Sequence, residues 1–251
     1  MEQGVCSLRQ RFGSGQSAHY IEQGNEGRYR YNLKNAELIK FGAWSCIMAC
    51  IGEFAIEMYA SSQLADYDSF RQTISYLGHT SSSLNGLMTF WGGIFTLLLV
   101  FFAIGFGKVF KKFRSVGFAV TLILIYGIAQ GIGAAYFSMN ISGPGPDTFW
   151  EVHNLSSGLG DIALVLFPFL MLGCFGAADK KTLRITAFTA WCGLFFVCLF
   201  LIAKYFPSSS LGDYKGLLQR IFQLIYYGYF TFIAIKMLKS LNDAKYGQVV
   251  S

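Results

Sequence analysis

Six long apolar runs separated by short polar connections limit what this sequence can fold into. The hydrocarbon core of a bilayer is about 30 Å thick, so a helix needs roughly 20 mostly apolar residues to cross it. A crossing segment must also satisfy its own backbone hydrogen bonds, as a helix does. The predicted spans are residues 38–60, 84–106, 115–137, 158–175, 183–206 and 217–238. The sequence therefore predicts an all-α, polytopic transmembrane bundle of six helices.

The composition agrees with one membrane domain. Of 251 residues, 53% are hydrophobic and only 14% are charged, unlike the profile of soluble proteins. Short connections between the spans leave no room for a separate soluble domain. We therefore expect a polar flexible tail over residues 1–37, a six-helix domain over 38–240 and a short tail over 241–251.

Lysine and arginine fall on alternate connections, and this bias predicts the orientation of the helices. The basic connections contain Lys108, Lys111, Lys112 and Arg114 after the second span, and Lys180, Lys181 and Arg184 after the fourth. The first connection has only Arg71 and the third has neither residue type. Because short basic loops stay in the cytoplasm, both termini are predicted to be cytoplasmic. The net charge of +6 thus reflects orientation and anionic lipids, and not nucleic-acid binding.

Ionisable side chains within the apolar runs are the first candidates for a functional site. Glu53 and Glu57 are one helical turn apart on the first span. A carboxylate at membrane depth is costly when it faces lipid, so both are expected to face the bundle interior. Asp161 is expected near the outer, N-terminal end of the fourth span, where helix N–H groups favour an anion. Arg220, at the start of the sixth span, is the expected partner for one of the three carboxylates.

Two histidines extend this predicted outer layer. His79 and His153 both occur in the pattern His-x-x-Ser-Ser-x-x-Gly, and both are expected to lead from an outer loop into a helix. The shared pattern has two possible explanations: chance together with helix capping by the serines, or an internal repeat of a helical hairpin. Histidine titrates near neutral pH, so the pair would form a pH-sensitive rim. The predicted ligand-binding residues are Glu53, Glu57, His79, His153, Asp161 and Arg220.

The third span shows how the helices are expected to pack. Gly127 and Gly131 form a small-xxx-small face that permits close helix approach, and Gln130 beside them is placed to hydrogen-bond to a neighbouring helix. Cys46 and Cys50 share a helix face and are interpreted as packing residues.

Two short motifs resemble a known family. They are Ile74-Ser75-Tyr76-Leu77-Gly78 after an acidic stretch, and Gly216-Leu217-Leu218-Gln219-Arg220 at the start of the sixth span. The sequence resembles, over about residues 38–240, a family of six-helix membrane proteins classed as a domain of unknown function. The resemblance rests on Ser75, Leu77, Gly78, Gly216 and Arg220. It implies a compact six-helix bundle with polar residues at one membrane face, and it implies no substrate or catalytic residue.

Three functions remain open on the sequence. The leading hypothesis is an outward-facing pocket that binds a small polar ligand or a lipid headgroup, with transport as one version. The alternatives are a membrane-embedded lipid hydrolase with His and carboxylate chemistry, and a noncatalytic scaffold. The sequence has no HExxH motif or nucleophile elbow, so no catalytic residue, metal or cofactor is assigned. If Arg220 anchors a ligand, its removal abolishes binding and spares the fold; if it belongs to a structural network, its removal unfolds the protein.

Overall fold

The computed structural model describes residues 17–139, 148–175 and 179–247, with side chains described for 35–139, 148–175 and 179–241. The chain divides into two units, Met1–Glu37 and Leu38–Ser251. The division falls at the predicted boundary between the first tail and the membrane domain. Residues from Ser17 onward are already helical, which the prediction of a flexible tail did not include. The flexibility of the two tails stays a prediction.

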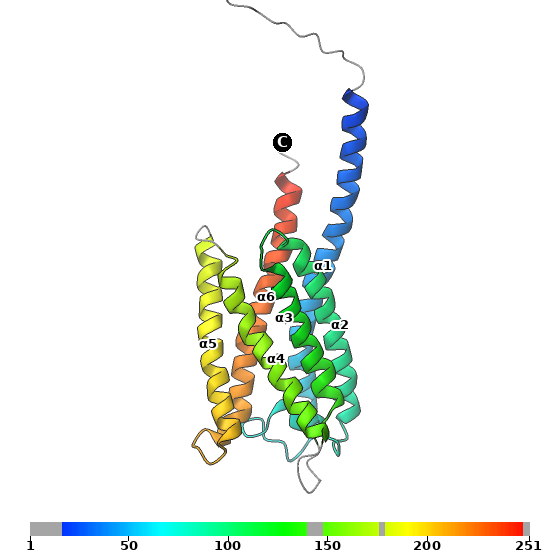
Figure 1. Ribbon diagram of the computed structural model, residues 1–251. Coiled ribbons are helices and arrows are strands. Elements are labelled where there is room, and N and C mark those ends of the chain that lie inside the picture. The colour runs from blue at the N-terminus through cyan, green and yellow to red at the C-terminus, as the bar shows by residue number, and fades with distance from the viewer. Residues whose placement is uncertain (1–16, 140–147, 176–178, 248–251) are drawn as a thin grey trace, which may run out of the picture. The chain divides into compact units, whose positions relative to one another are not determined.

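Six helices in the described part of the chain are long and apolar enough to cross a membrane. This confirms the predicted all-α, multi-pass architecture. The helices are α1 (Ser17–Gln63), α2 (Asn85–Val109), α3 (Val116–Gly127), α4 (Thr148–Leu172), α5 (Lys180–Tyr205) and α6 (Lys215–Gly247) (Figure 1). A π-helix, η2 (Ile128–Ala134), continues α3, and two short 3₁₀ helices, η1 (Ile74–Gly78) and η4 (Gly212–Tyr214), lie in connections.

Helix α4 begins at Thr148, whereas the sequence predicted a start at residue 158. The first turns of α4 contain His153 and several small polar residues. Because these residues interrupt the apolar run, the sequence predicted a loop there. His153 therefore lies inside the helix and not in a loop. Asp161 follows Thr148 by thirteen residues, or about 20 Å at 1.5 Å per residue, so its expected place near the helix N-terminus was wrong.

Consecutive helices are neighbours in the bundle formed by the second unit. Helix α2 contacts α3, α3 contacts α4, α4 contacts α5 and α5 contacts α6, while α2 also reaches α6. Helix α1 approaches α2 closely at Gly42, where an added Cβ atom would lie 2.6 Å from the Phe101 carbonyl oxygen and 3.0 Å from the Gly105 Cα atom. Small residues permit such close approach between membrane helices, where dispersion contacts drive the association.

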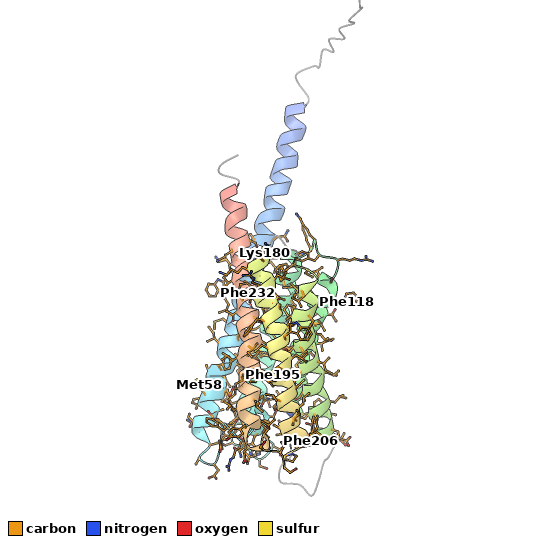
Figure 2. All side chains as sticks on the ribbon, turned by 90° about the vertical axis from the view of Figure 1, so that its left-hand side faces the viewer. Met58, Phe118, Lys180, Phe195, Phe206 and Phe232 are labelled. Atoms are coloured by element: carbon orange, nitrogen blue, oxygen red, sulfur yellow. The ribbon has the colours of Figure 1, made fainter. Side chains whose placement is uncertain are left out.

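Aromatic side chains fill the centre of the bundle. The largest fully buried ones are Tyr226, Tyr229, Phe102, Phe106, Phe167 and Phe230. The Tyr126 and Tyr227 hydroxyls join α3 to α6 with an oxygen–oxygen distance of 2.8 Å. On the outside, Met58 and Phe118 are 72% and 73% exposed, and Figure 2 shows apolar side chains projecting from the helices. Apolar surface of this kind is suited to contact with lipid.

The two ends of the bundle differ in charge. We call the end with the α2–α3 and α4–α5 connections the basic end; it contains Lys108, Lys111, Lys112, Arg114, Lys180, Lys181 and Arg184. There, Lys236 Nζ lies 2.5 Å from Asp179 Oδ2, and Asp179 accepts a hydrogen bond from the Thr182 amide at the start of α5. The hydrogen bonds from Lys236 and Thr182 hold the pKa of Asp179 well below its usual range. The opposite end contains η1 and η4, and we call it the η1 end.

The orientation of these ends is a testable prediction. We expect a cysteine introduced as Asp213→Cys at the η1 end to react with a membrane-impermeant maleimide on intact cells. A Lys112→Cys variant should react only after permeabilisation, because basic connections remain cytoplasmic. Both side chains are exposed, and the unmodified protein gives the background from its own cysteines. The reverse labelling pattern would show that the protein is inserted the other way.

Candidate functional site

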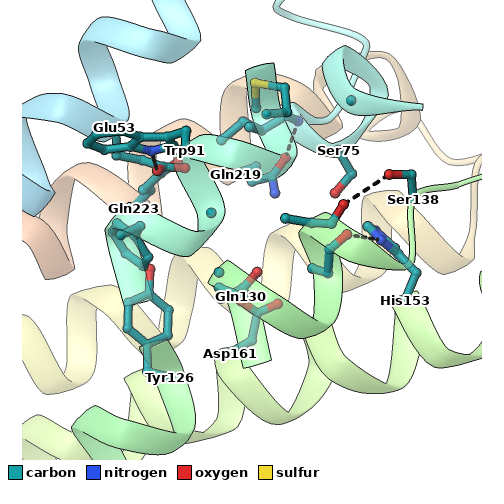
Figure 3. A pocket seen from close by; sticks show the side chains of 18 of the residues that line it. Glu53, Ser75, Trp91, Tyr126, Gln130, Ser138, His153, Asp161, Gln219 and Gln223 are labelled. Carbon is teal, nitrogen blue, oxygen red and sulfur yellow. Dashed lines mark hydrogen bonds between the residues drawn. The ribbon is translucent and has the colours of Figure 1, made fainter. Parts of the chain in front are cut away.

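A cavity of about 110 Å³ lies among the helices near the η1 end (Figure 3). Its polar lining residues are Glu53, Ser75, Trp91, Tyr126, Gln130, Ser138, His153, Asp161, Gln219, Gln223 and Tyr227. Every membrane helix except α5 contributes to this lining. An apolar cavity of about 150 Å³ admits benzene, so this cavity is large enough for several waters or a ligand of a few non-hydrogen atoms. Drug-sized pockets are larger, at about 300–1,000 Å³.

Glu53 reaches the cavity from α1 beside a glycine. A Cβ atom at Gly52 would overlap the Trp91 ring. The glycine therefore leaves room for the Trp91 indole of α2 to pack against α1. From there Trp91 Nε1 donates a hydrogen bond of 2.6 Å to Glu53 Oε2. The other carboxylate oxygen, Oε1, has no hydrogen-bond partner among the described residues.

Asp161 on α4 repeats this arrangement. A Cβ atom at Gly160 would lie 2.8 Å from two atoms of the Gln130 side chain. Gln130 Nε2 donates to Asp161 Oδ1 at 3.1 Å and to the Ser157 carbonyl at 3.2 Å. In both cases a glycine precedes the acid and makes room for a donor from a neighbouring helix. Each carboxylate is thus held by one neutral donor and keeps one oxygen for another partner.

The π-helix η2 shapes the wall between these two carboxylates. Its i→i+5 turns disturb the α-helical ladder, and side chains from other helices donate to carbonyls in and beside it. Thr96 Oγ1 lies 2.8 Å from the Gly127 oxygen and Thr89 Oγ1 lies 3.1 Å from the Ala135 oxygen. Gly131 packs against α2, where a Cβ atom would overlap Thr96 and the Gly92 carbonyl. The close approach predicted for the third span is therefore present, and a wide turn accompanies it.

His153 binds the end of the same wall. Its Nδ1 atom lies 2.9 Å from the Ala134 oxygen and 3.0 Å from the Phe137 oxygen. Both partners are acceptors, so Nδ1 carries the proton and donates. The Nε2 atom of a neutral ring is then an acceptor, and it has no partner among the described residues. His153 therefore contributes an orienting contact and a free acceptor to the cavity that it lines.

Glu57 and Arg220 do not line this cavity. Arg220 Nε lies 2.5 Å from Glu57 Oε1, so among the three expected carboxylates Glu57 is its ion-pair partner. Both residues line a separate, mostly apolar groove between α1 and α6. The remaining guanidinium donors bind the α1–α2 connection: Nη1 lies 2.7 Å from the Ser69 oxygen, and Nη2 donates to the Tyr67 hydroxyl at 2.7 Å. Arg220 thus fastens this connection to α6.

Gly216 completes the attachment. The amides of Gly216 and Leu217 donate to the Phe70 carbonyl at 2.8 and 3.1 Å, which satisfies free N–H groups at the start of α6. A Cβ atom at Gly216 would overlap three carbonyl oxygens of the connection. One turn later, Gln219 Oε1 accepts a hydrogen bond of 2.9 Å from the Ile74 amide. We call the contacts of Gly216, Gln219 and Arg220 with residues 67–74, together with the Glu57–Arg220 ion pair, the loop latch.

A family model described as "Protein of unknown function (DUF998)" matches residues 47–236, about three quarters of the chain. The chain belongs to this DUF998 family. This confirms the resemblance to a six-helix family of unknown function. No curated protein and no solved structure matches the chain.

The structure explains the residues that carry the DUF998 resemblance. Gly216 and Arg220 belong to the loop latch, and Leu77 is fully buried beneath the connection with Ala60 and Ile74. Ser75 and Gly78 line the cavity. The loop latch holds the connection that contains Ser75 and Gly78. The residues of the resemblance therefore include some that attach this connection and some that line the cavity.

His79 lies apart from the cavity in this DUF998 protein. Its Nδ1 atom accepts a hydrogen bond of 3.2 Å from the Ser81 amide, and its ring packs edge-on against Tyr76. Burial lowers the pKa of the His79 imidazole below its usual value. The ring is thus neutral at pH 7, as its role as acceptor requires.

Of the six predicted site residues, the structure brings Glu53, His153 and Asp161 to the cavity. Sequence reasoning missed Trp91, Tyr126 and Gln223, which are uncharged and therefore do not stand out in an apolar span as an acid does. It noted Gln130 only as a packing residue. A usable signal was the glycine that precedes each cavity acid. Among the described residues, no three His, Cys, Asp or Glu side chains gather as metal ligands.

Proposed function

We propose that this DUF998 protein binds a small polar ligand in the cavity near the η1 end. One observation carries the proposal: the carboxylates of Glu53 and Asp161 line a cavity in which no described lining residue is Lys or Arg. Ionisable groups at membrane depth are costly, and they persist where they face a partner or a polar cavity. Neither carboxylate forms an ion pair with a described residue, and a ligand would supply that partner.

The loop latch provides an internal comparison. Where this protein uses a carboxylate structurally, at Glu57, it pairs it directly with Arg220. The cavity carboxylates instead accept from an indole and a side-chain amide, and each keeps a free oxygen. Lys204 acts electrostatically on Asp161, but the two form no ion pair. The difference favours a ligand site over the noncatalytic scaffold.

Binding is a better supported role than passage across the membrane. Between the cavity and the basic end the bundle is filled by fully buried aromatic side chains, including Phe102, Phe106, Phe167 and Phe230. Transport would require these rings to separate. The proposal is therefore limited to a ligand that enters and leaves at the η1 end.

Thermal unfolding of the purified protein in maltoside detergent tests the proposal. The panel contains small cations, neutral polyols and small anions at millimolar concentrations. We expect at least one compound to raise the midpoint, because a ligand at ten times its Kd stabilises the folded state by about 1.4 kcal/mol. The shift should shrink in Glu53→Gln and Asp161→Asn. It should persist in Glu151→Gln, which changes an exposed acid on the same helix as Asp161.

Two other outcomes would contradict the proposal. A panel without any shift would remove the ligand site and favour the scaffold. Release of product from lipid by the unmodified protein, lost in His153→Gln, would favour the hydrolase, because His153 Nε2 is the free base of the cavity.

A further inference from the structure

We infer that the ligand of the cavity carries an ammonium group, so that the site takes a small organic cation. This inference rests on the proposed function and specifies its ligand class. The cavity lining combines two acidic side chains, free hydrogen-bond acceptors and aromatic rings, and these three features point to the same chemistry.

Charge gives the first argument. Glu53 and Asp161 line the cavity from α1 and α4, and no Lys or Arg is among the described lining residues. An anionic ligand would be repelled by this lining, and a neutral one would leave Glu53 without a counter-charge and Asp161 with only Lys204, with which it forms no ion pair. A monovalent cation offsets part of the charge.

Unused hydrogen-bond acceptors give the second argument. Gln223 is 6% exposed, and its side-chain oxygen is buried without a partner among the described residues. Glu53 Oε1 and Asp161 Oδ2 are also unpaired, whereas the Trp91 and Gln130 donors are already used. Leaving a buried acceptor without a donor is destabilising. An ammonium group has three N–H donors and no acceptor, which matches these free oxygens.

The walls and the volume narrow the ligand further. Trp91, Phe95, Tyr126 and Tyr227 line the cavity, and aromatic faces attract cations. A volume of about 110 Å³ accommodates an ammonium group with a short carbon chain. A free amine and the amine of a lipid headgroup share this chemistry, so the experiment must distinguish the two sources.

The test compares n-propylammonium, 1-propanol and propionate by calorimetry with the full chain in maltoside detergent, which has no amine of its own. Propylammonium and propanol have the same number of non-hydrogen atoms and differ in charge. We expect propylammonium to bind at least tenfold more tightly than either other probe. Glu53→Gln and Asp161→Asn should each weaken it at least tenfold, and Glu151→Gln should change it less than twofold.

The outcomes separate this inference from the proposed function. Tighter binding of propanol or propionate would overturn the ammonium assignment and leave a polar ligand site. If none of the cations, polyols and anions in the thermal-unfolding panel binds, both the ammonium assignment and the proposed function are overturned. If short-chain phosphatidylethanolamine displaces propylammonium and short-chain phosphatidylglycerol does not, the source is a lipid headgroup; if neither does, it is a free amine.

A second measurement does not depend on the acidic variants folding. Ser75 lines the cavity, so Ser75→Cys places a thiol there. We expect a cationic methanethiosulfonate to modify it at least tenfold faster than an anionic reagent of similar size, with the unmodified protein as background. Equal rates, or faster reaction of the anion, would overturn the inference.

Discussion

A Gly216→Val variant should lose about 3 kcal/mol or more of unfolding free energy, because α6 and the α1–α2 connection touch at this residue. A Cβ atom there would lie 2.5 Å from the Ser69 oxygen and 2.9 Å from the Phe70 oxygen. Overpacking alone costs about 1–3 kcal/mol. Moving the connection away would also break the bonds from the Gly216 and Leu217 amides to Phe70. Denaturation of purified protein in detergent measures the loss.

Gly228 is the matched control on the same helix. A Cβ atom there would have no heavy atom within 4 Å, and the residue is exposed. Gly228→Ala should therefore be neutral or should stabilise the protein by up to about 1 kcal/mol through helix propensity. Similar stability of the Gly216 and Gly228 variants would contradict the close contact described for the latch.

An Arg220→Gln variant should lose about 3–5 kcal/mol, the cost of breaking a buried pair by removing one partner. Glu57 is 5% exposed, and its Oε2 atom already has no partner among the described residues. The variant also removes donors from the Ser69 and Gln72 carbonyls and from Tyr67. Chemical denaturation with a fold-sensitive spectroscopic signal provides the measurement.

Arg71→Gln is the control for the loss of an arginine. Arg71 lies 3.8 Å from Asp68 and 3.6 Å from Asp213, and its side chain is 65% exposed. Exposed pairs contribute at most about 1 kcal/mol, so this variant should stay close to the unmodified protein. Ligand binding separates the two interpretations of Arg220. If Arg220→Lys is fully stable but does not bind the cavity ligand, Arg220 is a ligand anchor and not a part of the latch.

The six helices could be predicted because apolar length and backbone satisfaction leave few alternatives in a bilayer. The start of α4 could not. His153 lines the cavity and Ser156 packs against Gly133, so polar residues interrupt the apolar run while the helix continues. A prediction based on the length of apolar runs therefore assigns such polar, cavity-lining residues to a loop.

Several residues of the site could be predicted individually, but their arrangement in space could not. Glu53 and Asp161 stand out because an acidic side chain in an apolar span is costly unless it has a partner or faces a polar cavity. The sequence left Arg220 three possible partners, and only the packing of α1 against α6 selects Glu57. The neutral residues Trp91 and Gln130 have no such cost, and their contacts depend on close approach to Gly52 and Gly160.

The π-helix η2 also makes the exact number of residues in this helix important. A turn with i→i+5 bonds takes in one residue more than an α-turn, and each α-helical residue rotates the chain by about 100°. Removing one residue within η2 would therefore convert the wide turn to an α-turn and leave the register of the helix beyond it nearly unchanged. The Gly127 carbonyl, which accepts a hydrogen bond from Thr96 Oγ1, would then be available to the regular α-helical ladder. A one-residue deletion here would remove the wide turn from the cavity wall, which no single substitution does.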